Sequence, residues 1–251
     1  MLEDENFRLL KACRMPSALE FYQEKCNSPE FLTISSAEVL NQVLTHEIEG
    51  RVQKKYVRDL KNANLFYSKA RVEDIDYHAE RSLKPSVINA LIALSWITRL
   101  QNIIILGATG SGKSYLADCF GELCVRDGHI VYRYRLADLL EEAELARADG
   151  SLPKLKKKIT KCKALILDDL GIAPIVGNGR NDLLSFIESK VTTGSLIITS
   201  QLPVEAWYEW IGDPTIADAI LDRIIHRSHI IELKGKDSMR KLYEGIDGGA
   251  K

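Results

Sequence analysis

The sequence contains no long hydrophobic run, few cysteines and few histidines, and each of these absences excludes a class of protein. No stretch approaches the roughly 20 apolar residues that span a membrane, and the acidic start is unlike a signal peptide. Five scattered cysteines without C-x-x-C spacing indicate reduced thiols and not a disulfide framework. Five dispersed histidines form no H-E-x-x-H pattern, which argues against zinc. We therefore expect a cytoplasmic protein with no membrane partner.

The charge of the chain is nearly balanced in total but unevenly distributed. The net charge of −1 by itself argues against nucleic-acid binding. However, residues 51–71 carry seven basic residues against one acid, and residues 154–163 carry six lysines and no acid. Such blocks either form a solvated helix face or contact a phosphate backbone, which attracts positive charge whatever the base sequence. The residues that we consider for contact with double-stranded DNA are Arg51, Lys54, Lys55, Arg58, Lys61, Lys156, Lys157 and Lys158.

The first part of the chain is patterned as helices. Residues 1–75 show helical periodicity without strands, which predicts a small all-helical N-terminal domain for DNA binding or oligomerisation. Within it, the apolar residues Val52, Tyr56, Leu60 and Ala63 recur at helical spacing. This spacing predicts an amphipathic helix whose basic residues lie on the opposite side.

The second part, residues 76–251, alternates strand and helix patterns. This alternation predicts an α/β domain in which a parallel sheet is flanked by helices. Pro85 disfavours helical geometry at the residue before it, so we expect a new helix over 86–100. The last predicted strand, 229–233, is followed by 18 residues, and we expect no C-terminal lid domain.

The most informative motif is the glycine-rich segment 107–114, which lies between a β-branched run at 102–106 and a helical pattern at 115–123. It follows the pattern G-x-x-x-x-G-K-[ST], the Walker A phosphate loop. The backbone N–H groups of such a loop and the positive end of the next helix bind nucleotide phosphates. Lys113 is expected to reach the β- and γ-phosphates, and Ser114 to ligate Mg²⁺. The predicted nucleotide-binding residues are Gly107, Ala108, Thr109, Gly110, Ser111, Gly112, Lys113 and Ser114.

A second motif ends an apolar strand pattern at 164–167 in the two carboxylates Asp168 and Asp169. In a phosphate-loop protein this is the Walker B pattern, in which Asp168 serves Mg²⁺. Asp169 is then placed to polarise the water that attacks the γ-phosphate, so we assign it as catalytic together with Lys113. The pair predicts hydrolysis of ATP with Mg²⁺ as cofactor. In the alternative interpretation, the two aspartates only cap the next turn.

A polar run follows the predicted strand 195–199. One of Thr199, Ser200 and Gln201 is expected to sense the γ-phosphate between the two Walker motifs, and the sequence does not decide which. We include Thr199 and Ser200 among the catalytic candidates. Alternatively, these residues cap a turn.

Arg223 lies on a predicted helix over 215–226. An arginine held on a helix near a sheet edge is able to act in trans on a neighbouring subunit's ATP, as an arginine finger. The alternative is a surface ion pair, for instance with Asp222 or Asp218, and the spacing alone favours this alternative.

Taken together, these segments resemble the IstB family, the helper ATPases of bacterial insertion sequences, which are related to DnaC-type helicase loaders within the AAA+ group. The resemblance covers most of the chain. Because the Walker motifs are shared by all AAA+ proteins, the flanking segments carry the family resemblance. The matching segments are 9–16, 61–63, 102–114, 165–171, 198–203 and 219–224.

The resemblance implies an AAA+ P-loop domain in a protein that forms a homo-oligomer on DNA, helps to select a target site and stimulates a cognate transposase. It favours Arg223 as the trans-acting finger and suggests Arg240 as an arginine near the nucleotide. Gln201 stands where the family generally has Asn, and Met239 where it has an aromatic residue. The alternative functions are a helicase loader and a DNA-bound scaffold that uses ATP only as a structural switch.

Overall fold

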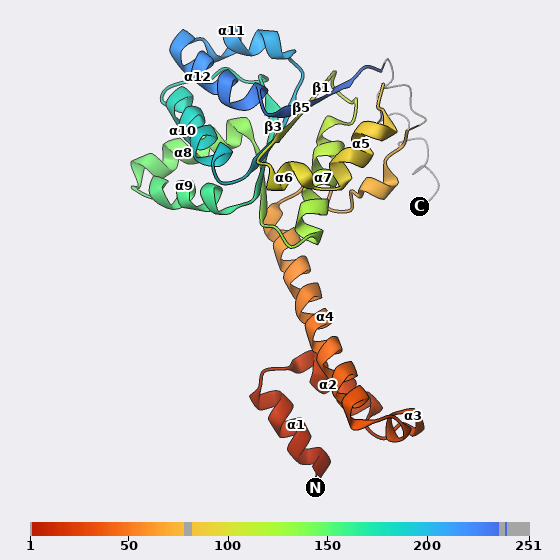
Figure 1. The fold of residues 1–251 in the computed structure, drawn as a ribbon. Helices are drawn as coiled ribbons and strands as arrows, with labels where there is room; N and C mark the ends of the chain where they lie inside the picture. Colours follow the sequence, from red (N-terminus) through yellow and green to blue (C-terminus); the bar gives the residue numbers. More distant parts are fainter. Residues whose placement is uncertain (1, 78–81, 236–238, 240–251) are drawn as a thin grey trace, which may run out of the picture. The chain divides into compact units, whose positions relative to one another are not determined.

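The computed structural model describes residues 2–77, 82–235 and 239 (Figure 1). The chain divides into two units, Met1–Arg58 and Asp59–Lys251. The division falls within helix α4 (Ser36–Ala63), whereas the sequence predicts a domain boundary at residue 75. Each unit has a hydrophobic core of its own.

The N-terminal unit consists of short helices packed on the first part of α4. Its small core contains Ala18, Phe31 and Val43. The Glu47 carboxylate on α4 is buried and accepts the backbone N–H groups of Ser17 and Ala18 at 2.9 and 3.0 Å. These amides belong to the first turn of α2, where no intrahelical acceptor exists, so Glu47 caps that helix. The helices before α4 are α1 (Leu2–Ala12), α2 (Pro16–Lys25) and α3 (Pro29–Thr33).

We expect Glu47→Gln to lower the free energy of unfolding of the N-terminal unit by about 1–3 kcal/mol, because it weakens a buried cap and removes the ion pair with Arg51. Burial raises the pKa of Glu47, but the Ala18 N–H, Arg51 and the Ser17 N–H together outweigh it and lower the pKa below 4.5. The stabilisation is therefore present above this value and is lost as the pH falls through the folded-state pKa. Thermal unfolding of the full chain at neutral and acidic pH measures both effects. Glu49→Gln, an exposed change of the same charge on α4, is the control; equal losses in the two variants would contradict the cap.

The second unit is built on one parallel sheet with the strand order β2-β3-β4-β1-β5. The central strands are apolar runs that helices bury on both faces, as parallel strands require. The predicted α/β class is confirmed. Among the described residues, no helical domain follows β5. The strands are β1 (Asn102–Gly107), β2 (Val131–Arg135), β3 (Ala164–Leu170), β4 (Ser195–Ser200) and β5 (Ser228–Leu233).

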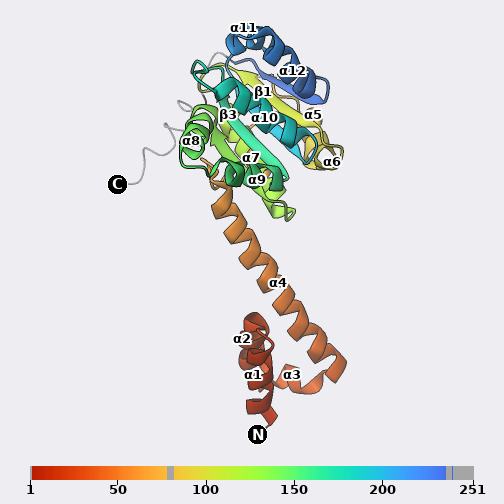
Figure 2. The ribbon, with the colours of Figure 1, turned by 90° about the vertical axis from the view of Figure 1, so that its left-hand side faces the viewer.

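Helices cover both faces of this sheet. Helix α7 packs on one face, and α8 and α10 pack on the other, which faces the viewer in Figure 2. No described helix is long and apolar enough to cross a membrane. The helices of this unit are η1 (Val72–Asp74), α5 (Pro85–Ile92), α6 (Ser95–Thr98), α7 (Lys113–Arg126), α8 (Leu136–Ala148), α9 (Leu152–Lys161), α10 (Gly179–Val191), η2 (Val204–Ala206), α11 (Trp207–Ile211) and α12 (Pro214–Ile225).

Two sequence predictions about helices are corrected by the structure. The single helix expected over 86–100 is two helices, α5 and α6, because Leu94 takes a left-handed conformation with φ of 55° between them. The apolar side expected for α4 is buried to different degrees along the helix: Ala63 is buried, Tyr56 and Leu60 are half-buried, and Val52 is 61% exposed. Helical spacing predicts which side of a helix is apolar, but it does not predict how deeply each residue on that side is buried.

Candidate functional site

The segment 108–112 forms a tight loop between β1 and α7. Gly112, the N-cap residue directly before α7, has φ of 93°, a conformation that favours glycine. A Cβ on Gly107 would lie 2.8 Å from the Leu233 carbonyl oxygen, so no larger residue fits where the loop meets β5. The loop therefore has the close turn directly before a helix N-terminus that a phosphate-binding loop requires.

Lys113 and Ser114 begin α7 and project their side chains differently. The Lys113 side chain is almost fully buried, and its Nζ donates to the Ala108 carbonyl oxygen at 2.9 Å, back across the loop. The Ser114 hydroxyl donates to Asp168 Oδ1 at 2.9 Å. The two predicted motifs thus meet at the carboxyl ends of β1 and β3, which is where ligands bind to open parallel sheets.

Asp168 is buried and has three partners. Its Oδ1 accepts the hydroxyls of Ser114 and Thr199, and its Oδ2 accepts Arg133. Every carboxylate contact is thus made by a donor from a different element: α7, β4 and β2. Such a charge-assisted network fixes the orientation of the carboxylate.

Asp169 takes a left-handed conformation with φ of 63°, at the point where the register of β3 against β4 shifts. Its N–H donates to Thr199 Oγ1 at 3.0 Å, and its Oδ2 lies 3.2 Å from the Arg135 guanidinium. This backbone conformation is uncommon outside glycine and is often found at functional sites. It gives Asp169 a partly exposed side chain beside the buried Asp168.

The three polar residues at the end of β4 have different surroundings. Thr199 is buried and contacts both aspartates. Ser200 is buried, donates to the Leu170 carbonyl oxygen and accepts the Leu202 N–H. Gln201 is exposed and accepts the Thr109 hydroxyl at 2.8 Å. Gln201 thus contacts the phosphate loop directly.

Arg133 and Asp118 were not identified in the sequence. Arg133 lies between two carboxylates, with its Nε 3.2 Å from Asp118 Oδ1 and its terminal nitrogen on Asp168. Burial raises the pKa of Asp118 to about 6, although the Tyr67 N–H and Arg133 act against the rise. The alternation of 132–135, Tyr-Arg-Tyr-Arg, was a usable signal, because it places two arginines on one face of a strand.

Arg223 is held within its own chain. It donates to the Ala219 carbonyl oxygen at 2.7 Å and forms an ion pair of 2.9 Å with Glu188 on α10. The partner considered from spacing, Asp222, instead contacts His226. The Arg223 side chain is 36% exposed, which leaves it accessible. Arg240 lies outside the described residues.

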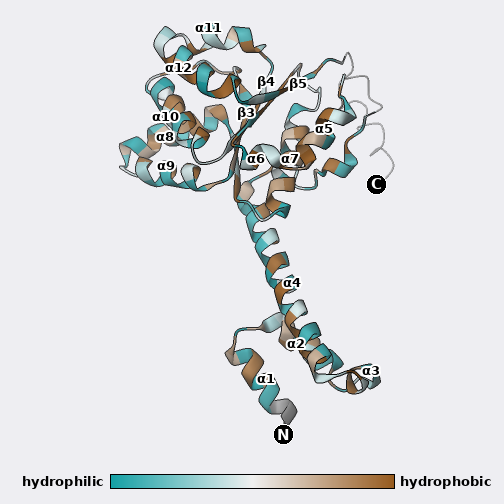
Figure 3. Cartoon of the chain, in the orientation of Figure 1, coloured by the Kyte–Doolittle hydropathy of each residue, from teal (hydrophilic) through white to brown (hydrophobic). Residues whose placement is uncertain are grey.

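The candidate DNA residues fall on α4 and α9, and Figure 3 shows α9 as mainly hydrophilic. Several of them make contacts within their own unit, among them Lys54, whose Nζ donates to the Ser17 hydroxyl at 3.4 Å. Arg51 pairs with Glu47 at 2.7 Å, and Lys158 donates to the Tyr134 hydroxyl at 2.6 Å. Most of the set is exposed: Lys54, Lys55, Arg58, Lys61 and Lys157, whereas Lys156 is half-buried.

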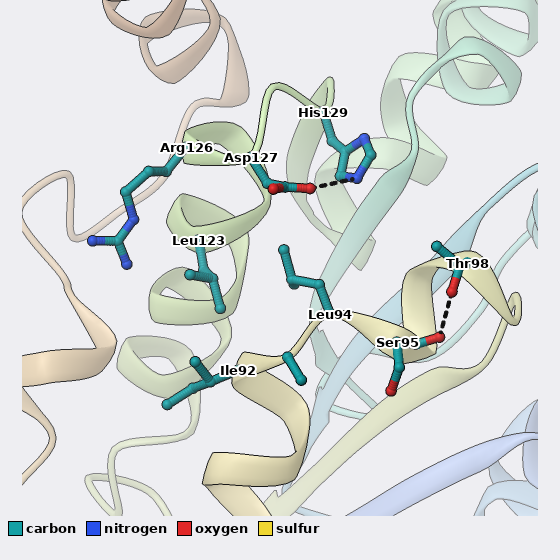
Figure 4. Close-up of a pocket in the computed structure, with 9 residues that line it drawn as sticks. Ile92, Leu94, Ser95, Thr98, Leu123, Arg126, Asp127 and His129 are labelled. Atoms are coloured by element: carbon teal, nitrogen blue, oxygen red, sulfur yellow. Dashed lines mark hydrogen bonds and ion pairs between the residues drawn. The ribbon is translucent and has the colours of Figure 1, made fainter.

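A hollow of about 560 Å³ lies at the opposite end of α7 from the phosphate loop (Figure 4). It is lined by the last turn of α7, including Leu123 and Arg126, and by α5 and α6. Asp127 and His129 also line it, with His129 Nε2 3.2 Å from Asp127 Oδ2. This hollow is therefore separate from the candidate nucleotide site.

The parallel sheet and the phosphate loop define a P-loop nucleotide-binding protein with the AAA+ fold. Solved structures share this fold. The DnaC helicase loader has a TM-score of 0.55 and 16% identity, and the match covers 66% of this chain and 97% of that one. DnaA bound to AMPPCP from Aquifex aeolicus has a TM-score of 0.57 and 13% identity, and the match covers 73% of this chain and 56% of that one. The chain belongs to the family of IstB-like ATP binding proteins, whose model matches residues 8–244.

Curated relatives agree with this family. The insertion sequence ATP-binding protein y4uH of Sinorhizobium fredii is 38% identical over 242 residues, 96% of this chain and 97% of that protein. The ATP-binding protein of insertion sequence IS21 from Pseudomonas aeruginosa is 30% identical over 79% of this chain and 75% of that protein. The predicted family resemblance is confirmed.

Proposed function

We propose that this protein is a Mg²⁺-dependent ATPase that forms a homo-oligomer on double-stranded DNA and regulates a cognate transposase. The observation that carries the proposal is the convergence of the phosphate loop with the acidic end of β3, where Ser114 Oγ lies 2.9 Å from Asp168 Oδ1. Asp169, next in the chain, adds a second acid beside this pair. Membership of a family found in insertion sequences supports the transposition context.

The oxygen atoms of Ser114 and Asp168 fit a magnesium ion. Mg²⁺ prefers hard oxygen ligands and is usually held by one or two protein side chains together with substrate phosphates. When bound, the ion supplies positive charge to the β- and γ-phosphates. The close approach of a hydroxyl and a buried carboxylate supports this site.

Of the other groups, those of the phosphate loop bind the nucleotide, and Asp169 takes part in the hydrolysis. The N–H groups of 108–112 bind phosphate oxygens, and Lys113 exchanges the Ala108 carbonyl for them. Asp169 orients the attacking water and accepts its proton. We assign the γ-phosphate sensor to Gln201, because it contacts the loop, and a bracing role to Thr199, which contacts both aspartates.

DNA contact through α4 predicts a strong dependence on salt. Each phosphate contact adds about 0.9 to the slope of log affinity against log salt concentration. We expect the triple variant K54Q/K55Q/R58Q to reduce this slope by up to about three, because three exposed cations are removed. Fluorescence anisotropy with a labelled duplex, titrated at several salt concentrations, measures it.

The matched control for this measurement is R8Q/K11Q/K25Q, which removes the same charge from α1 and α2 outside the basic blocks. We expect its slope to equal that of the wild type. If the α4 variant keeps the wild-type slope as well, α4 does not contact the phosphates.

The proposed function as a whole is tested by measuring the ATPase rate and the oligomeric state together, with and without double-stranded DNA. We expect DNA and ATP together to produce an oligomer, and turnover to require Mg²⁺. Stable ATP-dependent assembly without turnover would favour the scaffold alternative. Recovery of a replicative helicase, with a preference for single-stranded DNA, would favour the loader alternative.

A further inference from the structure

Arg133 lies between two carboxylates, that of the Walker B residue Asp168 and that of Asp118 on α7. Its side chain is 9% exposed and lies on β2, beside β3 in the sheet. One nitrogen of the guanidinium contacts Asp168 Oδ2, and the Nε lies 3.2 Å from Asp118 Oδ1. The approach to Asp118 is an ion pair and not a hydrogen bond, since neither of its two atoms has a hydrogen-bond partner among the described residues. A guanidinium is suited to such a bridge, because its charge is delocalised over three nitrogens and is able to face two carboxylates at once. Lysine, with a single ammonium on a flexible stem, does not provide this geometry.

The chain that follows α4 also contacts Arg133 and Asp118. The Tyr67 N–H donates to Asp118 Oδ2 at 2.8 Å, and the Phe66 ring centroid lies 5.6 Å from the Arg133 guanidinium carbon. Tyr67 also packs edge-on against Tyr115 in the first turn of α7. All of these residues belong to the second unit, so the contacts lie within one body.

The bridge has a consequence for the two oxygens of Asp168. Arg133 takes Oδ2, and this leaves Oδ1 directed at Ser114 and Thr199. Oδ1 is therefore the oxygen that faces the proposed magnesium site. A carboxylate that is hydrogen-bonded through only one oxygen is free to rotate about the Cβ–Cγ bond. A carboxylate that is held through both oxygens keeps the same oxygen directed at the ion.

We propose that Arg133 is a positioning residue for the nucleotide site, held by Asp118 and by the Phe66–Tyr67 segment so that Asp168 presents Oδ1 to Mg²⁺. The inference rests on the proposed function, because it requires Asp168 to serve the ion. It adds a role to the segment that directly follows α4: displacement of Phe66 and Tyr67 changes the hold on Arg133 and, through it, the orientation of Asp168.

The test compares the dissociation constant of a fluorescent ATP analogue in Mg²⁺ with that in EDTA. The ratio of the two constants isolates the part of the affinity that depends on the ion. We expect R133M/D118N, which removes one charge of each sign, to reduce this ratio about 10- to 100-fold, as loss of groups that orient metal ligands does. The constant in EDTA is expected to change little, since the phosphate loop is untouched. R133K is expected to recover only part of the ratio.

Phe66→Ala is the second variant and separates positioning from folding. Phe66 is 68% exposed, so its removal costs little stability, yet its ring lies over the guanidinium. We expect a smaller reduction of the same ratio, about two- to threefold, as a modest weakening of a cation–π contact produces. Thermal unfolding confirms that each variant is folded.

The outcomes are distinct. An unchanged ratio in folded R133M/D118N and F66A overturns the role of Arg133 while leaving the proposed function intact. A wild-type protein that binds no nucleotide in either condition overturns the proposed function itself. A reduced ratio in both variants, with EDTA constants near the wild-type value, supports the inference.

Discussion

Arg223→Ala is expected to lower the DNA-stimulated ATPase rate by about 10³–10⁵-fold, the range that arginine fingers contribute in phosphate transfer. The guanidinium is partly exposed on α12 and is paired with Glu188 in the single chain. In an oligomer, the developing charge on a neighbour's γ-phosphate is a stronger partner than an exposed carboxylate, because surface ion pairs contribute little. Steady-state turnover at saturating ATP and DNA measures the effect, with nucleotide affinity expected to change little.

Glu188→Gln is the control for this prediction. If Arg223 serves only the ion pair with Glu188, the two variants have the same consequence. We expect instead that Glu188→Gln keeps the rate within a few-fold of the wild type, because it frees the guanidinium without removing it. Equal losses in the two variants would assign Arg223 to structure and not to catalysis.

Asp169→Asn is expected to lower the ATPase rate by at least about 100-fold while nucleotide binding is retained. The amide has nearly the shape of the carboxylate but does not accept a proton from the attacking water. Binding is retained because Ser114 and Asp168, the residues proposed to hold the ion, are unchanged. Single-turnover hydrolysis, together with the affinity for a fluorescent ATP analogue, separates the two quantities.

Asp169→Glu provides the matched control, since it keeps the carboxylate and extends it by one methylene. We expect it to retain turnover. If Asp169→Asn hydrolyses ATP at the wild-type rate, Asp169 is not the catalytic base, and the Arg135 contact is only structural.

Mixing the two inactive variants tests whether the site is shared between subunits. An Arg223→Ala subunit keeps an intact nucleotide site, and an Asp169→Asn subunit keeps an intact finger. Where the first site meets the second finger, every required group is present. We expect such mixtures to recover part of the wild-type rate when DNA is present. No recovery in assembled mixtures would show that Arg223 does not act in trans.

The local part of the site could be predicted from the sequence because its chemistry depends on neighbours in the chain. The phosphate loop takes its form from the glycines, the lysine and the helix that follows within one segment, 107–114. The apolar run before Asp168 likewise identifies a buried strand that ends in acids. The alternation of such segments was enough to predict the parallel sheet, which the structure confirms.

The remaining contacts depend on which strands lie side by side, and periodicity does not contain that information. Arg133 meets Asp168 only because β2 pairs with β3, and Asp118 joins them only because α7 covers that face. Gln201 reaches Thr109 because β4 lies beside β1. The same limit explains Val52: helical spacing predicts an apolar side but not whether another element packs against it.

Strand β5 lies between Arg223 and the phosphate loop of the same subunit. In the proposed function, these two places contact different nucleotides. The strand begins soon after α12, which carries Arg223, and runs beside β1 until Leu233 lies opposite Gly107. The Met239 N–H then donates to the Gly110 carbonyl oxygen at 2.8 Å. In each subunit, the six residues of β5 would thus connect two places. One is the proposed finger, which completes a neighbour's nucleotide site, and the other is the subunit's own phosphate loop. In such an assembly, the two nucleotides that a subunit contacts would be linked through one strand of its sheet.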